Sequence, residues 1–244
     1  MIWQDGRERY IRERFIYHLR MMLEKVRKEV ENLLWKDASW HGMDHIQRVE
    51  KLSLQFAETE KGDLELILLI ALLHDVDDYK WVGEEQSKEM TNTKRILEMT
   101  DLSSERKEVV LREVSSIGYK KALKGIFPQT LEGKIVSDAD KCDAMGAVWL
   151  LRAYQYAIIH HQVFFERNLF LQSVKDQQGG ETTAVNHLFE KVLKLKEFLF
   201  TEAGKKEAEI RHQWMIHFLQ EFFREEFFSY NFLLSSALEK YKIY

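Results

Sequence analysis

Proline and glycine are scarce in this chain of 244 residues, which contains one proline and eleven glycines. Together they make up about 5% of the chain, whereas average usage is about 12%. A β-sandwich or β-barrel needs frequent turns that these residues mark, and a flexible linker needs them in bulk. The composition therefore excludes these classes and favours long helices joined by short connections.

Cysteine, a signal sequence, a long apolar run and excess positive charge are also lacking. The single cysteine, Cys142, cannot form an internal disulfide, which suits a reducing compartment. The N-terminal residues have no apolar core of a signal peptide, and the most apolar run, 64–73, is too short to span a bilayer. The net charge of −4 disfavours a surface for duplex nucleic acid, although it leaves room for a local basic pocket. We expect a cytoplasmic protein that binds neither membranes nor a nucleic-acid duplex.

Apolar residues recur at helical spacing along most of the chain. The periodicity predicts helices over 7–35, 43–60, 64–73, 84–99, 104–117, 130–160, 183–200 and 203–226. Asp63 and Ser103 are expected to cap the helices that follow them. A short break is expected at 36–39, an irregular functional loop at 118–129 and a long excursion at 161–180. We therefore expect an all-α helical bundle in a single domain, 1–244.

Two polar residues, His74 and Asp75, end the most apolar of these segments. Burying an unpaired imidazole or carboxylate is costly, so a divalent cation is a favourable partner for the pair. Nitrogen and oxygen ligands suit Mn²⁺, Fe²⁺, Co²⁺ or Mg²⁺ better than an ion that prefers thiolates. The further ligands must come from other segments, and the candidates are His45, Asp138, Asp140 and Asp143. The alternative is a structural polar cluster that links helices.

The order of these residues along the chain is a His, then a His-Asp pair, then a later Asp. This order resembles that of the HD superfamily of metal-dependent phosphohydrolases, which are all-helical. Four blocks, in order and at family-like spacing, resemble the bacterial branch of small HD nucleotide pyrophosphohydrolases. They are HGMDHIQRV, ALLHDVDDYKW, TLEGKIVSDADKCDAMGAVWLLRAYQYA and HLFEKVLKLKEFLFTEAGKKEAEIRHQWMIHFLQEFF. The matched core covers about 38–226. An N-terminal helical extension, 1–35, and an aromatic C-terminal tail, 227–244, lie outside it, and either could form a homodimer contact.

The resemblance implies a set of site residues. The metal ligands it implies are His45, His74, Asp75 and Asp140. It implies that Asp78, together with Asp75, has a catalytic role in orienting a water molecule or moving a proton. The candidates for binding the substrate are Lys80, Tyr119, Lys120, Lys141 and Arg152. No histidine lies between Asp75 and Asp140, which favours one metal ion over the two-metal variants of the family. We expect Mn²⁺, with Mg²⁺, Co²⁺, Fe²⁺ and Ni²⁺ as alternatives.

The remaining histidines and the cysteine have simpler interpretations. His41 lies four residues before His45, but the Glu of a zinc-protease HExxH motif is missing, so we expect a cap or a supporting role. Surface or interface roles are expected for His160, His161, His212 and His217. We expect His187 to serve packing and Cys142 to behave as a buried small apolar residue.

The resemblance implies hydrolysis of a nucleoside triphosphate, deoxy or ribo, to a nucleoside monophosphate and pyrophosphate. A bound divalent ion would lower the pKa of a water molecule and neutralise phosphate charge. Lys80 and Lys120 would hold the leaving pyrophosphate, and Asp78 would manage the proton. Two alternatives remain: a 5′-nucleotidase or phosphodiesterase on the same single-metal site, and a nucleotide-sensing module with little turnover.

Overall fold

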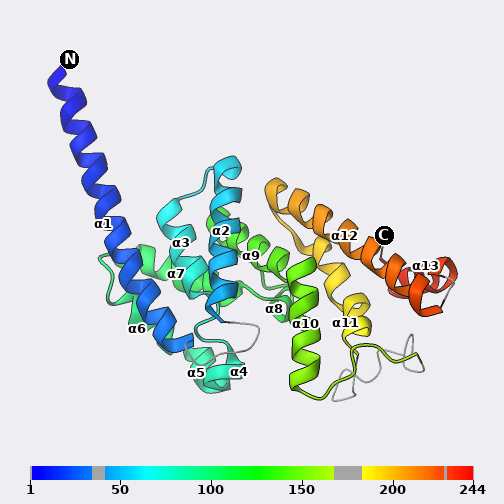
Figure 1. Ribbon diagram of the computed structural model, residues 1–244. Helices are drawn as coiled ribbons and strands as arrows, with labels where there is room; N and C mark the ends of the chain where they lie inside the picture. Colours follow the sequence, from blue (N-terminus) through cyan, green and yellow to red (C-terminus); the bar gives the residue numbers. More distant parts are fainter. Residues whose placement is uncertain (1, 35–41, 168–182, 228–229, 244) are drawn as a thin grey trace. The chain divides into compact units, whose positions relative to one another are not determined.

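The computed structural model describes the chain except for residues 1, 35–41, 168–182, 228–229 and 244 (Figure 1). The regular structure of the described part is helical, without any strand, which confirms the all-α prediction. The chain divides into two compact units, Met1–Val136 and Ser137–Tyr244, and the division falls inside one helix, α9 (Leu131–Asp143). The expected single domain stays a prediction.

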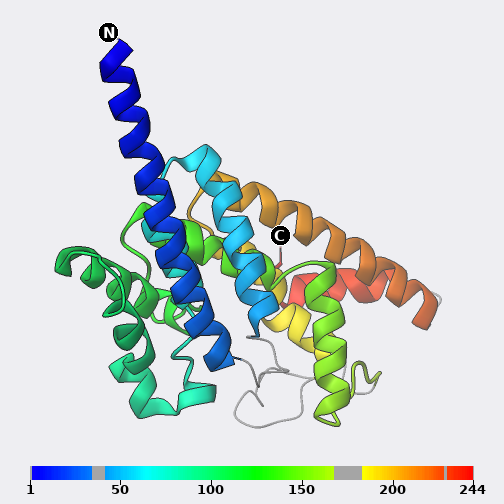
Figure 2. The same cartoon turned by 60° about the vertical axis from the view of Figure 1, so that its left-hand side comes forward.

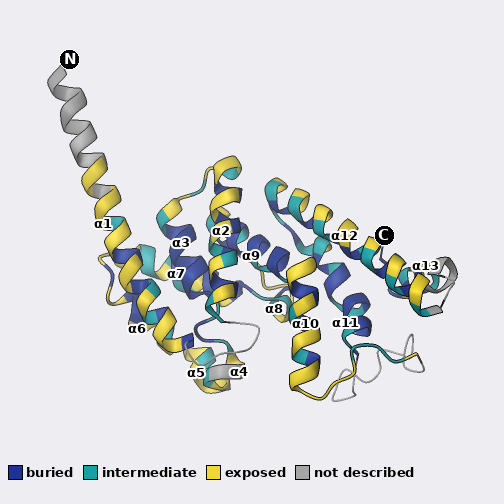
Figure 3. Cartoon of the chain, viewed as in Figure 1, coloured by how far each residue is buried: buried dark blue, intermediate teal, exposed yellow. Residues whose placement is uncertain are grey.

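The first unit is built around one buried helix. Its elements are α1 (Ile2–Leu34), α2 (Met43–Glu60), α3 (Leu64–Leu73), α4 (Tyr79–Val82), α5 (Glu84–Glu89), α6 (Thr91–Leu97), α7 (Ser104–Ser116), α8 (Tyr119–Ala122) and the start of α9. Helix α3 is apolar at nearly every position, and it is buried from Leu66 to Leu73 (Figure 3). It contacts α1, α2 and α7, and in the view of Figure 2 it lies largely behind α1.

Caps and short connections set the ends of these helices. The ranges of α2 and α3 are those that the periodicity predicts. Asp63 caps α3, because its carboxylate accepts hydrogen bonds from the backbone N–H groups of Glu65 and Leu66. Ser103 likewise accepts from the N–H of Arg106 at the start of α7. Both capping predictions are confirmed, and the expected break at 36–39 lies outside the described residues.

Two of the expected helices are each divided by a residue with positive φ. The range 84–99 divides into α5 and α6 at Met90, whose φ is 53°. The range 130–160 divides into α9 and α10 (Ala147–Ile159) at Gly146, whose φ is 87°. A left-handed residue cannot continue a right-handed helix, so the chain changes direction at these points.

The second unit continues with α10, α11 (Ala184–Glu190), the 3₁₀ helix η2 (Val192–Phe198), α12 (Glu202–Phe227) and α13 (Tyr230–Lys240). Helix α12 contacts α10, η2 and α13. The aromatic tail docks on this unit through Tyr241, whose ring stacks on Phe189 at 5.7 Å between centroids. Most of the expected excursion at 161–180 lies outside the described residues. Among the helices that are described, none combines the length and apolar character needed to cross a membrane.

Candidate metal centre

His45 and His74 meet where α2 begins and α3 ends. The connection between these helices is only three residues long, so they pack antiparallel and the first turn of α2 lies beside the C-terminus of α3. The Nε2 atoms of the two imidazoles are 3.1 Å apart. Both side chains are buried, with 7% of His45 and none of His74 exposed. Two ring nitrogens are thus held together in a place from which most water is excluded.

The backbone determines which nitrogen of His74 faces this point. Its Nδ1 atom lies 2.8 Å from the carbonyl oxygen of Ala71, one turn back in α3. A carbonyl oxygen can only accept, so Nδ1 carries the hydrogen and donates it. In the neutral ring Nε2 then carries the lone pair that can accept or ligate, the arrangement that metal-binding histidines have when the second ring nitrogen donates to a carbonyl.

Asp75 adds a carboxylate oxygen to the two nitrogens. Its Oδ2 atom lies 3.3 Å from Nε2 of His45 and 3.5 Å from Nε2 of His74. Ligands about 2.0–2.2 Å from a shared divalent ion are separated from one another by about 3.0–3.6 Å. The three atoms therefore have the spacing of ligands on one ion, and a set of nitrogen and oxygen donors suits a divalent metal ion.

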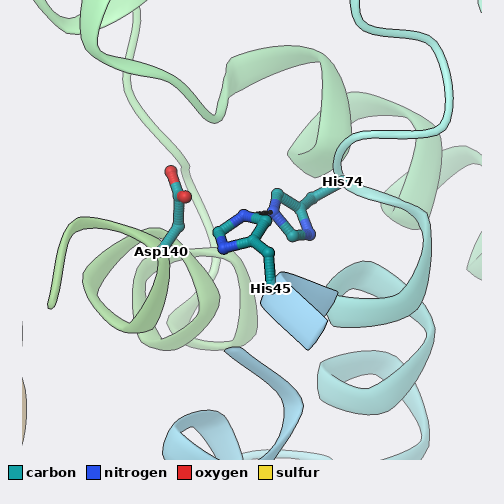
Figure 4. A group of neighbouring side chains, drawn as sticks. All are labelled: His45, His74 and Asp140. Atoms are coloured by element: carbon teal, nitrogen blue, oxygen red, sulfur yellow. Dashed lines mark hydrogen bonds between the residues drawn. The ribbon is translucent and has the colours of Figure 1, made fainter. Parts of the chain in front are cut away.

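Asp140 is the fourth residue of the expected ligand set. It lies on α9, whose first turn is held in the first unit because Glu132 accepts a hydrogen bond from the N–H of Asp63 at 3.0 Å. His45, His74 and Asp140 each offer one ligand atom, and these atoms lie within 4.8 Å of one another (Figure 4). The described residues thus contain a His/Asp cluster that could hold a metal ion.

Neighbouring carboxylates in the same two motifs have other partners. Asp77 accepts hydrogen bonds from the backbone N–H groups of Asn92 and Thr93 and from the Thr93 hydroxyl, at the start of α6. Asp138 accepts from the N–H groups of Phe200 and Thr201 and from the Thr201 hydroxyl, at the start of α12. These two residues hold helix ends in place, which leaves Asp75 and Asp140 as the better candidates for ligands.

Asp143, the third candidate of the SDADKCDA motif, accepts a hydrogen bond from Nη1 of Arg152 at 3.0 Å. The ammonium of Lys141 also has hydrogen-bond partners within the second unit. It is only 4% exposed, and its ammonium donates to the backbone oxygen and hydroxyl of Ser137. Burial lowers the pKa of Lys141, while Asp138 and Asp140 oppose this effect. Substrate binding by Lys141 and Arg152 stays a prediction.

The substrate-binding candidates of the first unit lie on two short helices. Lys80 belongs to α4, but its side chain lies outside the described residues. Tyr119 and Lys120 begin α8, where Tyr119 is half-buried and Lys120 is exposed. Nζ of Lys120 donates to the hydroxyl of Tyr79 at 2.8 Å. This bond places α8 beside the turn that carries Asp78.

Lys121 is a residue that the sequence interpretation missed. It is half-buried on α8, and the carboxylates of Asp75 and Asp78 attract its ammonium. Burial has the larger effect and lowers the pKa of Lys121 below its usual value. The sequence shows a lysine pair after Tyr119, but the family resemblance implies a role for the first lysine only.

Of the remaining histidines, His41 lies outside the described residues. His160, His161 and His217 are exposed, as predicted. Of the surface or interface role expected for His212, the surface role is wrong: it is 3% exposed, on α12, which packs against η2, and burial lowers its pKa. An interface role of His212 stays a prediction. His187 stacks on Trp149 at 6.1 Å between ring centroids, in agreement with a packing role.

Cys142 is expected to be unreactive in the native protein. It is fully buried, and burial raises the pKa of its thiol to about 12. At about pH 8 the reactive thiolate is then about a thousandfold rarer than for an ordinary cysteine. Reaction with Ellman's reagent should be at least about a thousandfold slower in the native protein than after unfolding in guanidinium. Rapid stoichiometric labelling of the native chain would contradict this burial.

The chain is similar to known proteins over most of its length. The family model of the HD domain matches residues 42–145, which include all four expected ligands. YpgQ of Bacillus subtilis (strain 168) is 29% identical over 199 residues, covering 81% of this chain and 90% of YpgQ. A crystal structure of YpgQ in complex with ADP has a TM-score of 0.66 at 25% identity, covering 85% of this chain and 96% of that chain.

A crystal structure of an HD-superfamily hydrolase from Bacillus thuringiensis is similar in both sequence and fold. It is 31% identical to this chain with a TM-score of 0.68. The comparison covers 85% of this chain and 97% of that chain. Together with the match of the family model, this similarity shows that the chain belongs to the HD superfamily.

Proposed function

We propose that the chain is a metal-dependent nucleotide pyrophosphohydrolase. It would convert a nucleoside triphosphate, deoxy or ribo, to the monophosphate and pyrophosphate. The observation that carries the proposal is the triangle of His45 Nε2, His74 Nε2 and Asp75 Oδ2, with sides of 3.1–3.5 Å. The similarity to YpgQ, which has been crystallised with ADP, supports a nucleotide as the ligand.

In this proposal one divalent ion, preferably Mn²⁺, is held by His45, His74, Asp75 and Asp140. When bound, the ion supplies charge neutralisation for phosphate oxygens and a water molecule of lowered pKa. The hydrogen bond from Nδ1 of His74 to Ala71 keeps the ring in the orientation and tautomer that binding needs.

The residues after the His-Asp pair would handle the proton and the substrate. The turn after α3 carries Asp78, whose carboxylate would accept the proton of the attacking water. Lys80, Tyr119 and Lys120 would bind the phosphates that leave as pyrophosphate. Lys141 and Arg152, which have partners in the second unit, remain secondary candidates. A cytoplasmic location and a homodimer through the terminal helices remain predictions.

The test is a nucleotide screen with a readout that separates the products. Metal-free protein is supplied with Mn²⁺, Mg²⁺, Co²⁺, Fe²⁺ or Ni²⁺ and offered dATP, ATP, AMP and cyclic AMP. Phosphate that appears from dATP or ATP only when inorganic pyrophosphatase is added supports the proposal. Direct release of phosphate from AMP indicates a 5′-nucleotidase, and consumption of cyclic AMP indicates a phosphodiesterase. Nucleotide binding without turnover indicates a sensing module.

A further inference from the structure

The two adjacent lysines of α8, Lys120 and Lys121, have different surroundings. Lys120 is exposed, and its Nζ donates to the Tyr79 hydroxyl at 2.8 Å while lying 4.8 Å from the centroid of the same ring. Tyr79 follows Asp78 directly and begins α4. The ammonium of Lys120 is therefore occupied by a partner, and this contact fixes α8 beside the turn after α3.

Lys121 is directed elsewhere, because neighbouring residues of a helix point about 100° apart. It is half-buried, and the charges that act on its ammonium are those of Asp75 and Asp78. Among the residues that the structure describes, no hydrogen-bond or ion-pair partner of this ammonium is found. Lys121 is thus a partly desolvated cation near two carboxylates and bonded to neither.

The third carboxylate of the same turn does not compete for Lys121. Asp77 is 8% exposed and accepts three hydrogen bonds from Asn92 and Thr93. Asp75 and Asp78, the expected ligand and the expected proton acceptor, are therefore the carboxylates on the side of Lys121. A partly buried cation without a bonded partner is stabilised by an anion that enters its surroundings.

We propose that Lys121, rather than Lys120, is the lysine that binds the phosphate group reacting at the metal centre. This inference rests on the proposed function and names the chemistry of one of its subsites. An ammonium is a compact point charge that suits a single phosphate oxygen. Its charge would oppose the repulsion between the phosphate and the carboxylates of Asp75 and Asp78. Because it is already in place, it would stabilise charge on the phosphate without a large rearrangement.

The experiment measures binding rather than turnover, with ADP as the probe and isothermal titration calorimetry in the presence of Mn²⁺. Lys121→Met should weaken ADP binding by about 10- to 100-fold, because one charged hydrogen bond is lost. Lys121→Arg keeps the charge and should stay within about threefold of the wild type. Lys120→Met should cost less than Lys121→Met. Lys124→Met, at an exposed position of the same loop, is the matched control and should change nothing.

A titration with Mn²⁺ alone separates phosphate binding from a structural role. Lys121→Met should leave Mn²⁺ affinity unchanged or raise it, since a nearby positive charge is removed. Reduced Mn²⁺ affinity would overturn the inference, because Lys121 would then shape the metal site. Unchanged ADP affinity in Lys121→Met, or a larger loss in Lys120→Met, would also overturn it. If any of these results overturned the role of Lys121, ADP binding by the wild type would still support the proposed function. A wild type that binds no ADP would count against the role of Lys121 and against the proposed function.

Discussion

Replacing His74 by glutamine is expected to abolish metal-dependent hydrolysis and to lower Mn²⁺ affinity by more than about 100-fold. Loss of a residue that only supports a ligand typically costs about 10- to 100-fold in metal affinity, so loss of a ligand should cost more. His74 is the buried corner of the ligand triangle, with its Nε2 oriented by the bond from Nδ1 to Ala71. Glutamine has a similar volume but offers only a weakly binding amide.

The measurement combines metal content after purification, Mn²⁺ titration and pyrophosphate release. His160→Gln is the matched control, because His160 is exposed at the end of α10 and belongs to no metal-binding cluster of the described residues. Denaturant midpoints for both variants check that they fold. Folded His74→Gln protein with wild-type metal content and hydrolysis would show that the site assignment is wrong.

The helices that the sequence predicts well are those whose signal is local. In α3 the apolar run and the cap at Asp63 lie within eleven residues, and the structure reproduces the expected range. The break at Met90 could not be predicted, because methionine has no local preference for the left-handed conformation that it adopts there.

In the site, too, some residues can be identified from their neighbours in the sequence, whereas others depend on partners that are distant in the sequence. The His74-Asp75 pair is visible because two polar residues end an apolar helix. The role of Asp138 is invisible locally, since its hydrogen-bond donors, Phe200 and Thr201, lie more than sixty residues later in the sequence. The difference between Lys120 and Lys121 depends on Tyr79, about forty residues earlier. Residue types therefore predict the chemistry of the motif, whereas the partner of each charge requires the fold.

Asp138→Ala is expected to destabilise the second unit by about 3–5 kcal/mol, a large effect for a single substitution. The Asp138 carboxylate accepts from the Phe200 N–H at 3.0 Å, from the Thr201 N–H at 2.7 Å and from the Thr201 hydroxyl at 2.8 Å. Alanine would leave these donors without their acceptor in a buried place. The Thr201 hydroxyl also accepts from the N–H of Gly204, so the N-terminal cap of α12 would be weakened as well.

The close fit around Asp138 supports the size of this effect. A Cβ atom at Gly204 would lie 2.5 Å from Oδ2 of Asp138 and 2.7 Å from its Cβ, so only glycine leaves room for the carboxylate.

Asp140→Ala, two residues further along the same helix, is the matched control. Asp140→Ala should lower the free energy of unfolding by less than about 1 kcal/mol and should remove Mn²⁺ binding. Asp138→Ala should lower the free energy of unfolding strongly, and the part of the protein that stays folded should still bind Mn²⁺. Chemical denaturation and Mn²⁺ titration of both variants test this. Equal unfolding midpoints, or loss of Mn²⁺ binding in folded Asp138→Ala protein alone, would mean that the two carboxylates have been assigned the wrong way round.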